Sequence, residues 1–178
     1  MQKHSGAEDA GHNLHDDLFE EIVTAHWEPI NSLAFRLTGD SQEAEDLALE
    51  TFIRLWRQSP GLSESVSGWL YRVALRLGFN ALRAAQRRRE YEWKAGRDAF
   101  DNSKPFDPPE QFERLEEQKR VRNVLAQLEE RQAKILVLRS SGLAYREIAE
   151  ILNLNPASIG TLLIRAEHDF EKVYKNGG

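Results

Sequence analysis

The chain has 178 residues, of which 40% are hydrophobic and none is cysteine, and its formal net charge is −5 at pH 7. This length suits one ordinary domain or two small ones, and the aliphatic content excludes a chain that is disordered throughout. The lack of cysteine excludes disulfides and thiolate metal sites and agrees with a reducing cytoplasm, and no stretch approaches the ~20 apolar residues of a membrane helix.

The charge is distributed unevenly along the chain. Residues 1–50 contain two basic and twelve acidic side chains, whereas residues 70–90 contain six arginines and one glutamate. Such asymmetry is expected when one surface faces phosphate and another faces a different partner. The acidic balance of the whole chain therefore does not argue against binding to nucleic acid.

The first third of the chain is predicted to contain a flexible tail, residues 1–15, and then two helices. After the tail, apolar residues recur at i, i+3 and i+4 spacing, which predicts an amphipathic helix that Pro29 bends or divides. Gly39 suits the left-handed cap of this helix, and Asp40 suits the N-cap of the next one.

The helix after Asp40 has apolar side chains on two faces. One face forms a continuous stripe that is predicted to be buried. The other face carries Leu49 and Ile53 among charged residues, which is unexpected if this face meets only water. Either a third helix of the chain covers these two side chains or a partner does, and the pattern favours neither alternative.

A strongly basic helix is predicted from Gly68 to about Arg89. Next to its apolar stripe runs a second stripe, with i, i+3 and i+4 spacing, formed by Arg72, Arg76, Phe79, Asn80, Arg83 and Arg87. Arginines bind phosphates and an aromatic ring can stack on an unpaired base, so the stripe suits single-stranded or melting DNA. Core packing is an equal alternative for the aromatic residue, whereas a merely solvated face is the weaker alternative for the arginines.

Residues 90–113 contain three prolines and no sustained period, and they are predicted to form a linker. Helical patterns resume near Leu115. Residues 145–152, a short turn and a helix that begins at Pro156 then form a helix-turn-helix, with Asn155 as N-cap. The N-terminal residues of the second helix of this motif face the major groove of DNA. No strand pattern occurs, so the predicted fold is all-α, with two small helical domains joined by a linker.

Five segments resemble the conserved motifs of one protein family, in the right order and over about residues 18–173. They are 44–57 (AEDLALETFIRLWR), 68–74 (GWLYRVA), 128–132 (LEERQ), 147–152 (EIAEIL) and 165–166 (RA). The first resembles a polymerase-binding helix, the second a helix that opens and reads the minus-ten promoter element, and the others a domain that binds the minus-thirty-five element. The chain thus resembles an extracytoplasmic-function sigma factor, a small subunit that directs bacterial RNA polymerase to promoters.

The resemblance implies a region 2-like domain at 16–89, the linker at 90–113 and a region 4-like domain at 114–178. It implies that core polymerase is bound by Asp46, Leu49, Glu50, Ile53, Arg54 and Arg57. It implies that the minus-ten element is bound by Arg72, Arg76, Phe79, Asn80, Arg83, Arg87 and Arg88. It places the minus-thirty-five element at Arg146, Ser158, Thr161, Arg165, His168 and Lys172. The implied partners are core RNA polymerase, promoter DNA and an anti-sigma factor, in the bacterial cytoplasm, with no cofactor, metal or catalytic residue.

The predicted recognition helix departs from the family pattern. Gly160, Leu162, Ile164, Glu167 and Asp169 stand where basic or polar residues are common. Of the two aliphatic residues, one is expected to pack internally, and the role of the other is open. Residues 139–178 carry five basic and five acidic side chains, so this domain attracts phosphate weakly. The sequence therefore predicts weak or unusual binding to the minus-thirty-five element.

Three alternatives compete with this interpretation. A DNA-binding regulator that does not join polymerase would leave the second face of the 44–57 helix and the arginine stripe without a role. A protein-interaction module that has lost DNA binding would account for Glu167 and Asp169. An enzyme is disfavoured, because the five histidines lack metal-ligand spacing and no Gly-rich phosphate loop or nucleophile elbow is present.

Overall fold

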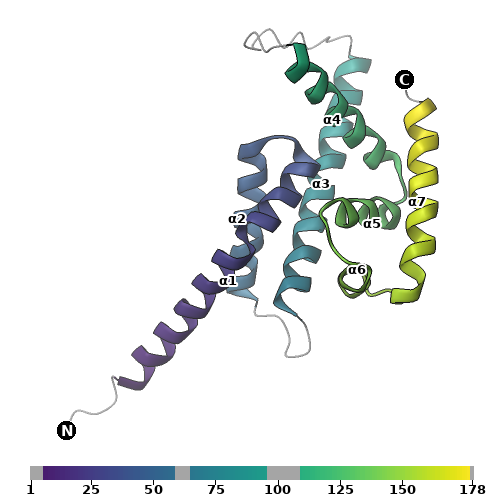
Figure 1. Cartoon of the computed structure of the whole chain (residues 1–178). Coiled ribbons are helices and arrows are strands. Elements are labelled where there is room, and N and C mark those ends of the chain that lie inside the picture. Colours follow the sequence, from purple (N-terminus) through teal and green to yellow (C-terminus); the bar gives the residue numbers. More distant parts are fainter. Residues whose placement is uncertain (1–5, 59–64, 96–108, 177–178) are drawn as a thin grey trace.

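A computed structural model of the protein describes residues 6–58, 65–95 and 109–176, and within these ranges it contains only helices and their connections (Figure 1). The helices are α1 (Gly6–Thr38), α2 (Ser41–Arg57), α3 (Val66–Lys94), α4 (Pro109–Gln127), α5 (Glu130–Ser140), α6 (Tyr145–Leu152) and α7 (Pro156–Asn176). The all-α prediction is confirmed. None of these helices, within the described part of the chain, is long and apolar enough to span a membrane.

α1 is a single helix that passes through Pro29 and begins at Gly6. Residues 6–15, expected to belong to a flexible tail, are therefore helical, whereas 1–5 lie outside the described residues. Once the first turns of a helix have formed, adding residues to it costs little free energy. Residues 6–15 can therefore be helical without a regular spacing of apolar side chains. Pro29 does not divide the helix. It removes one backbone donor, and the carbonyl that loses it belongs to the exposed residue Ala25, where water can replace the donor.

The expected linker is also shorter than its composition indicated. α3 continues to Lys94 and α4 begins at Pro109, both inside residues 90–113, and the remainder, 96–108, lies outside the described residues. Proline is tolerated at the first position of a helix because the N–H it lacks has no partner there. Its presence therefore marks the start of α4 rather than the extended chain that was expected.

The caps that the sequence predicted are present. Asp40 Oδ1 accepts a hydrogen bond of 2.8 Å from the backbone N–H of Glu43 at the start of α2, and Gly39 has a φ of 73° at the end of α1. Asn155 Oδ1 accepts from the N–H of Ala157 at 2.9 Å at the start of α7. These contacts satisfy donors that a helix terminus otherwise leaves without a partner.

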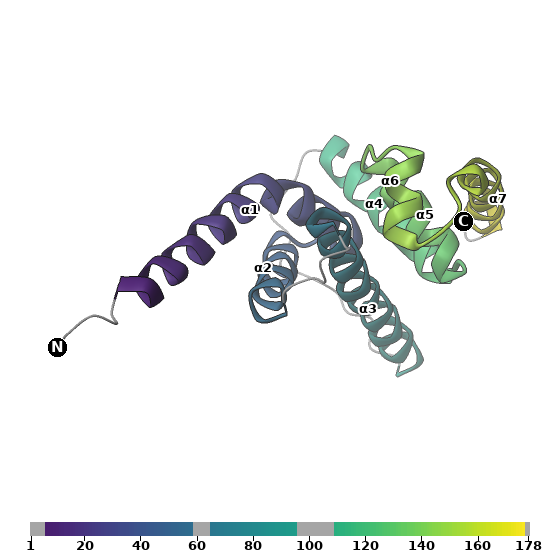
Figure 2. The same cartoon turned by 90° about the horizontal axis from the view of Figure 1, so that it is seen from below.

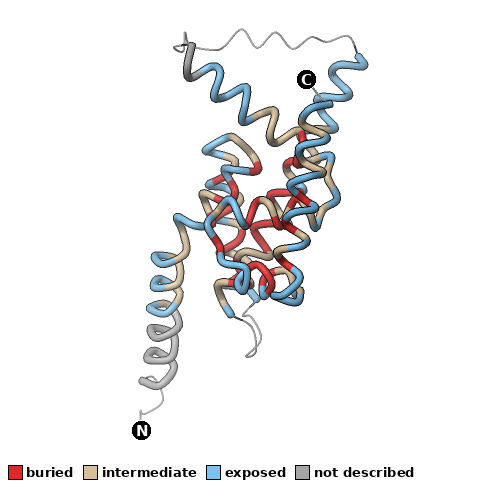
Figure 3. The backbone as a smooth tube through the Cα atoms, turned by 45° about the vertical axis from the view of Figure 1, so that its right-hand side comes forward, coloured by how far each residue is buried: buried red, intermediate tan, exposed pale blue. Residues whose placement is uncertain are grey.

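The first three helices pack together as one unit, and α4 to α7 form a second unit beside it. α1 contacts both α2 and α3, while α7 contacts α4, α5 and α6. The two units meet where α3 contacts α4 and α6. Figure 2 shows α5 and α6 between α3 and α7, so that α7 lies on the outer side of the molecule. The buried residues gather where the two units meet and along their centres (Figure 3).

Gly78 determines how closely α1 and α3 approach each other. A Cβ atom at this position would lie 2.5 Å from Leu37 Cδ1 and 3.3 Å from Leu37 Cβ. Leu37 is fully buried, so its side chain cannot swing out into solvent. A residue with a side chain would therefore push the two helices apart.

We expect Gly78→Ala to be less stable than Gly160→Ala by about 1–3 kcal/mol, the usual cost of overpacking a core. Gly160 is the matched control, because it also lies inside a helix but a Cβ there meets only Tyr145 Cε2, at an ordinary 3.7 Å. The gain in helix propensity is common to both changes and cancels in the comparison. Urea denaturation of the two variants measures the difference, and equal midpoints would contradict the close approach.

Candidate polymerase and promoter interface

The second face of α2 is open in the described structure. Leu49 is 52% exposed, Ile53 is half-buried and Asp46 is exposed. Beside them, Arg54 Nε donates to Glu50 Oε1 at 2.7 Å. The sequence left open whether another helix of the chain covers this face. Among the described residues, no helix covers Leu49. α2 therefore presents an apolar centre with charged residues around it.

The N-terminal part of α1 adds aromatic surface next to this face. Phe19 meets Trp56 of α2 edge to face, with ring centroids 4.9 Å apart, and Trp56 remains 42% exposed. Trp27 stacks on Phe52, which is buried. α1 thus supports the buried side of α2 and leaves the other side accessible.

The polar stripe of α3 is divided by its surroundings. Arg76, Asn80, Arg87 and Arg88 are exposed. Phe79 is only 2% exposed and belongs to the core, so the prediction that it stacks on a DNA base is wrong for this structure. The apolar stripe of α3 lies directly beside the arginine stripe. For this reason the sequence alone did not distinguish core packing of Phe79 from stacking on a base.

Arg72, near the start of α3, faces the end of α6. Its Nη1 lies 3.4 Å from the carbonyl oxygen of Glu150 and 3.5 Å from that of Ile151. The last carbonyls of a helix carry a partial negative charge, which favours a cation there. Ser65, the N-cap of α3, donates from its hydroxyl to Glu150 Oε1 at 2.6 Å. The start of α3 is thus bound to the end of α6.

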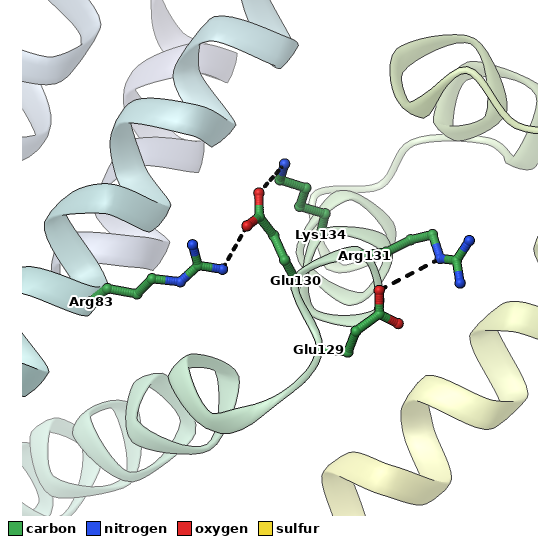
Figure 4. Close-up of polar contacts among 5 residues, drawn as sticks. All are labelled: Arg83, Glu129, Glu130, Arg131 and Lys134. Atoms are coloured by element: carbon green, nitrogen blue, oxygen red, sulfur yellow. Dashed lines mark hydrogen bonds and ion pairs between the residues drawn. The ribbon is translucent and has the colours of Figure 1, made fainter.

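Arg83 forms a second link between the units. Its Nη2 lies 2.7 Å from Glu130 Oε2 at the start of α5, and the same carboxylate accepts from Lys134. Figure 4 shows Glu130 between these two cations, whereas Glu129 and Arg131 point away from α3. The hydrogen bond from Lys134, and then the one from Arg83, lower the pKa of Glu130. Two arginines assigned to promoter DNA therefore contact the second unit in this arrangement.

The sequence did not identify Ser65, Glu130 or Glu150 as contacts of the basic helix. Glu130 belongs to a segment that the family resemblance covers, but its partner Arg83 is 47 positions away in sequence. Local patterns locate charges on a helix face and do not show which distant face meets it. The only available signal was the sign of the charges.

The helix-turn-helix is formed by α6 and α7. Asn153 ends α6 with a φ of 52°, a left-handed conformation that asparagine tolerates better than most residues. At the start of α6, Ala144 has no side-chain oxygen to cap the helix, and its own N–H donates to Glu147 Oε2 at 2.6 Å. One half of a capping box, the carboxylate that accepts from the N-cap N–H, is therefore present although the N-cap residue has no hydroxyl group.

α7 presents its predicted DNA contacts on one side. Its buried stripe is formed by Ile159, Leu163 and Ala166, which pack against the rest of the second unit. The candidate contacts on α7 are exposed, as is the one on α6, and they are Ser158, Thr161, Arg165, His168, Lys172 and Arg146. All of them lie within the helix-turn-helix, whose α6 packs against α3 and whose α7 lies on the outer side of the molecule.

The unusual residues of α7 have separate explanations. Leu162 packs against the core, whereas Ile164 is 68% exposed. Asp169 Oδ2 accepts a 2.6 Å hydrogen bond from Gln132 Nε2 of α5, and this hydrogen bond, with a second one from His168, lowers the pKa of Asp169. The carboxylate of Asp169 therefore joins two helices of the second unit, and its presence does not indicate that DNA binding has been lost.

Comparisons with known proteins agree with these two units. Residues 15–88 match the family model "Sigma-70 region 2", and residues 118–167 match "Sigma-70, region 4". The RNA polymerase sigma factor YlaC of Bacillus subtilis is 29% identical over 89% of this chain and 92% of its own length. The ECF RNA polymerase sigma factor SigE of Mycolicibacterium smegmatis is 30% identical over 83% of this chain and 58% of its own length.

Two solved structures have a similar fold. The first is CnrH in complex with the cytosolic domain of CnrY, with a TM-score of 0.58 and 17% identity; the match covers 92% of this chain and 91% of that one. The second is the sigma factor RpoE in complex with the anti-sigma factor NepR from Bartonella quintana, with a TM-score of 0.52 and 22% identity; the match covers 88% of this chain and 96% of that one. With two matched regions in the family's order and relatives along nearly the whole chain, this protein belongs to the extracytoplasmic-function group of the sigma-70 family and is a transcription initiation factor that acts with RNA polymerase at promoter DNA.

Proposed function

We propose that the first unit performs two tasks at once, binding core polymerase through α2 and holding melted minus-ten DNA with α3. The observation that carries this proposal is the presence of an open apolar face and an exposed arginine stripe on neighbouring helices of one packed unit. The polymerase contacts are Asp46, Leu49, Glu50, Ile53, Arg54 and Arg57. The minus-ten contacts are Arg72, Arg76, Asn80, Arg83, Arg87 and Arg88.

We further propose that the second unit docks on the minus-thirty-five element through α7 and Arg146. We propose residues 16–89 as the domain for the first task and residues 114–178 as the domain for the second; their described residues belong to α1–α3 and to α4–α7, respectively. The chain acts in the bacterial cytoplasm and contributes binding energy and promoter opening, while the polymerase performs the chemistry. By analogy with the RpoE–NepR complex, an anti-sigma factor is the proposed regulatory partner.

The contacts between the units bear directly on promoter binding. Arg72 and Arg83 have fewer N–H donors available for phosphates while Arg72 Nη1 remains on the carbonyls of α6 and Arg83 Nη2 on Glu130. Promoter binding through the whole guanidinium groups of these two residues therefore competes with the contacts that hold the second unit on α3. In this proposal, core polymerase binds the open face of α2, and the two units separate on its surface.

Leu49→Glu is expected to weaken binding to core polymerase at least tenfold. Burying a leucine contributes about 1.5–3 kcal/mol, and 1.4 kcal/mol is a factor of ten in affinity. The matched control is Leu115→Glu, a change at an exposed leucine of α4 outside the proposed face. Titration of fluorescently labelled protein with core polymerase from the same bacterium measures both affinities. Unchanged affinity for Leu49→Glu would contradict the assignment of α2.

Arg76→Ala is expected to leave core binding unchanged and to reduce promoter opening. Each lost phosphate contact lowers the slope of log affinity against log salt by about 1. Permanganate footprinting across a series of KCl concentrations, on a promoter whose start site the wild-type holoenzyme defines, measures this slope. Arg36→Ala, at an exposed arginine of α1, is the control. If Arg76→Ala has the wild-type slope, the stripe does not hold the promoter.

Glu130→Gln is expected to lower the free energy of unfolding at pH 7 by up to about 1 kcal/mol, as for other surface ion pairs. The lowered pKa of Glu130 means that its charged form stabilises the folded state above its ordinary pKa of 4.5, and that this contribution disappears as the pH falls through the lowered value. The difference between wild type and variant should therefore shrink toward pH 3.

The control for that experiment is Glu129→Gln, whose carboxylate has a 3.8 Å contact with Arg131, with both side chains more than half exposed. Thermal unfolding between pH 3 and pH 7 measures all three proteins. A difference for Glu130→Gln that does not vary with pH, or an equal one for Glu129→Gln, would contradict a link through Arg83 and Lys134.

A further inference from the structure

Ile164 has an unusual position for an aliphatic side chain. It is 68% exposed, the most exposed aliphatic side chain among those whose burial the structure describes. It belongs to α7, the helix that the helix-turn-helix presents to the major groove. Exposure of this extent means that no described part of the chain uses its apolar surface.

Two of the four helical neighbours of Ile164 on α7 are predicted DNA contacts, and the other two are Gly160 and the exposed Glu167. Thr161 precedes it by three positions and His168 follows it by four, the spacings at which side chains of a helix lie next to each other. Both neighbours are exposed. The buried stripe, with Ile159 and Leu163, lies on the other side of the helix. Ile164 is therefore part of the outward face and not of its edge with the core.

The turn before Ile164 leaves room around it. Helical side chains lean toward the N-terminus, so Ile164 lies over the turn that contains Gly160. A Cβ atom at Gly160 would meet nothing nearer than Tyr145 Cε2 at 3.7 Å. The absence of a side chain there keeps the methyl groups of Ile164 accessible to a flat surface such as the edge of a base pair.

The distance along the helix also fits. Ile164 lies eight residues after Pro156, which corresponds to about 12 Å at the rise of an α-helix. The major groove is wide enough to admit an α-helix along its path, so a residue about two turns from the start of α7 can still face base edges. Thr161, Ile164 and His168 share this exposed side of α7.

Only one apolar group is present on base edges in the major groove, the C5-methyl group of thymine. We propose that Ile164 contacts this methyl group in the upstream promoter element and makes the protein selective for thymine at that position. The balanced charge of residues 139–178 strengthens the argument, because weak attraction to phosphate leaves more of the affinity to contacts with bases. This inference rests on the proposed function of the second unit.

The test removes the methyl group from the DNA. Each thymine of the upstream element of a mapped promoter is replaced by deoxyuridine, which has the same base-pairing groups but lacks the methyl. We expect one such replacement to weaken binding of the wild-type holoenzyme about fourfold, the value of one buried methyl group. Holoenzyme with Ile164→Ala should bind the thymine promoter more weakly and lose nothing further on replacement.

Ile164→Val is the matched control, since its methyl groups keep the contact and the sensitivity to deoxyuridine. Melting temperatures of both variants establish that α7 remains folded. The proposal is overturned if no replacement affects the wild type, or if Ile164→Ala keeps the full fourfold effect. It is also overturned if Ile164→Ala lowers transcription as much from a promoter with a scrambled upstream element as from the original promoter. That result would mean that Ile164 contacts a protein and not DNA. Failure of the wild-type chain to assemble with core polymerase would instead remove the proposed function itself.

Discussion

The docking of the second unit on the basic helix α3, through α4, α6 and the start of α5, is the interaction on which the arrangement of this protein depends. A helix rich in arginine can pack against another part of the chain only where each guanidinium group meets an acceptor. Glu130 accepts from Arg83, and the carbonyls at the end of α6 accept from Arg72. These contacts place the second unit on one side of α3. As a result, α7 lies outside and the second face of α2 stays open (Figure 2).

The same contacts are individually modest. The side chains of Arg83 and Glu130 are 37% and 44% exposed, and ion pairs with such exposure stabilise a protein by 0–1 kcal/mol. These polar contacts accompany the shared apolar core of the two units, and their modest strength allows the arginines to exchange partners. Phosphate groups of DNA offer the guanidinium groups charge-assisted hydrogen bonds of the same geometry. A sigma factor that passes from the free state to a polymerase and then to a promoter benefits from such interchangeable contacts.

Local features of the fold could be predicted from the sequence, because they depend on neighbours a few residues apart. The caps at Gly39, Asp40 and Asn155 and the helix-turn-helix are of this kind. Features that depend on distant neighbours could not. The stripe of α3 alone does not show that Phe79 is buried while the arginines beside it are accessible, because that depends on which helices pack on which side. The hydrogen bond from Ser65 to Glu150 joins residues 85 positions apart, and no local pattern indicates it.

Ser65 has two roles that are physically inseparable. Its hydroxyl oxygen accepts from the backbone N–H of Gly68, which caps α3, and its proton is donated to Glu150. A hydroxyl group that donates to a carboxylate becomes a better acceptor, because the two bonds polarise each other. The first turn of the basic helix is consequently firmest while the molecule is closed. Departure of α6 removes the bond to Glu150 and leaves the weaker capping bond between Gly68 and Ser65 to hold this turn.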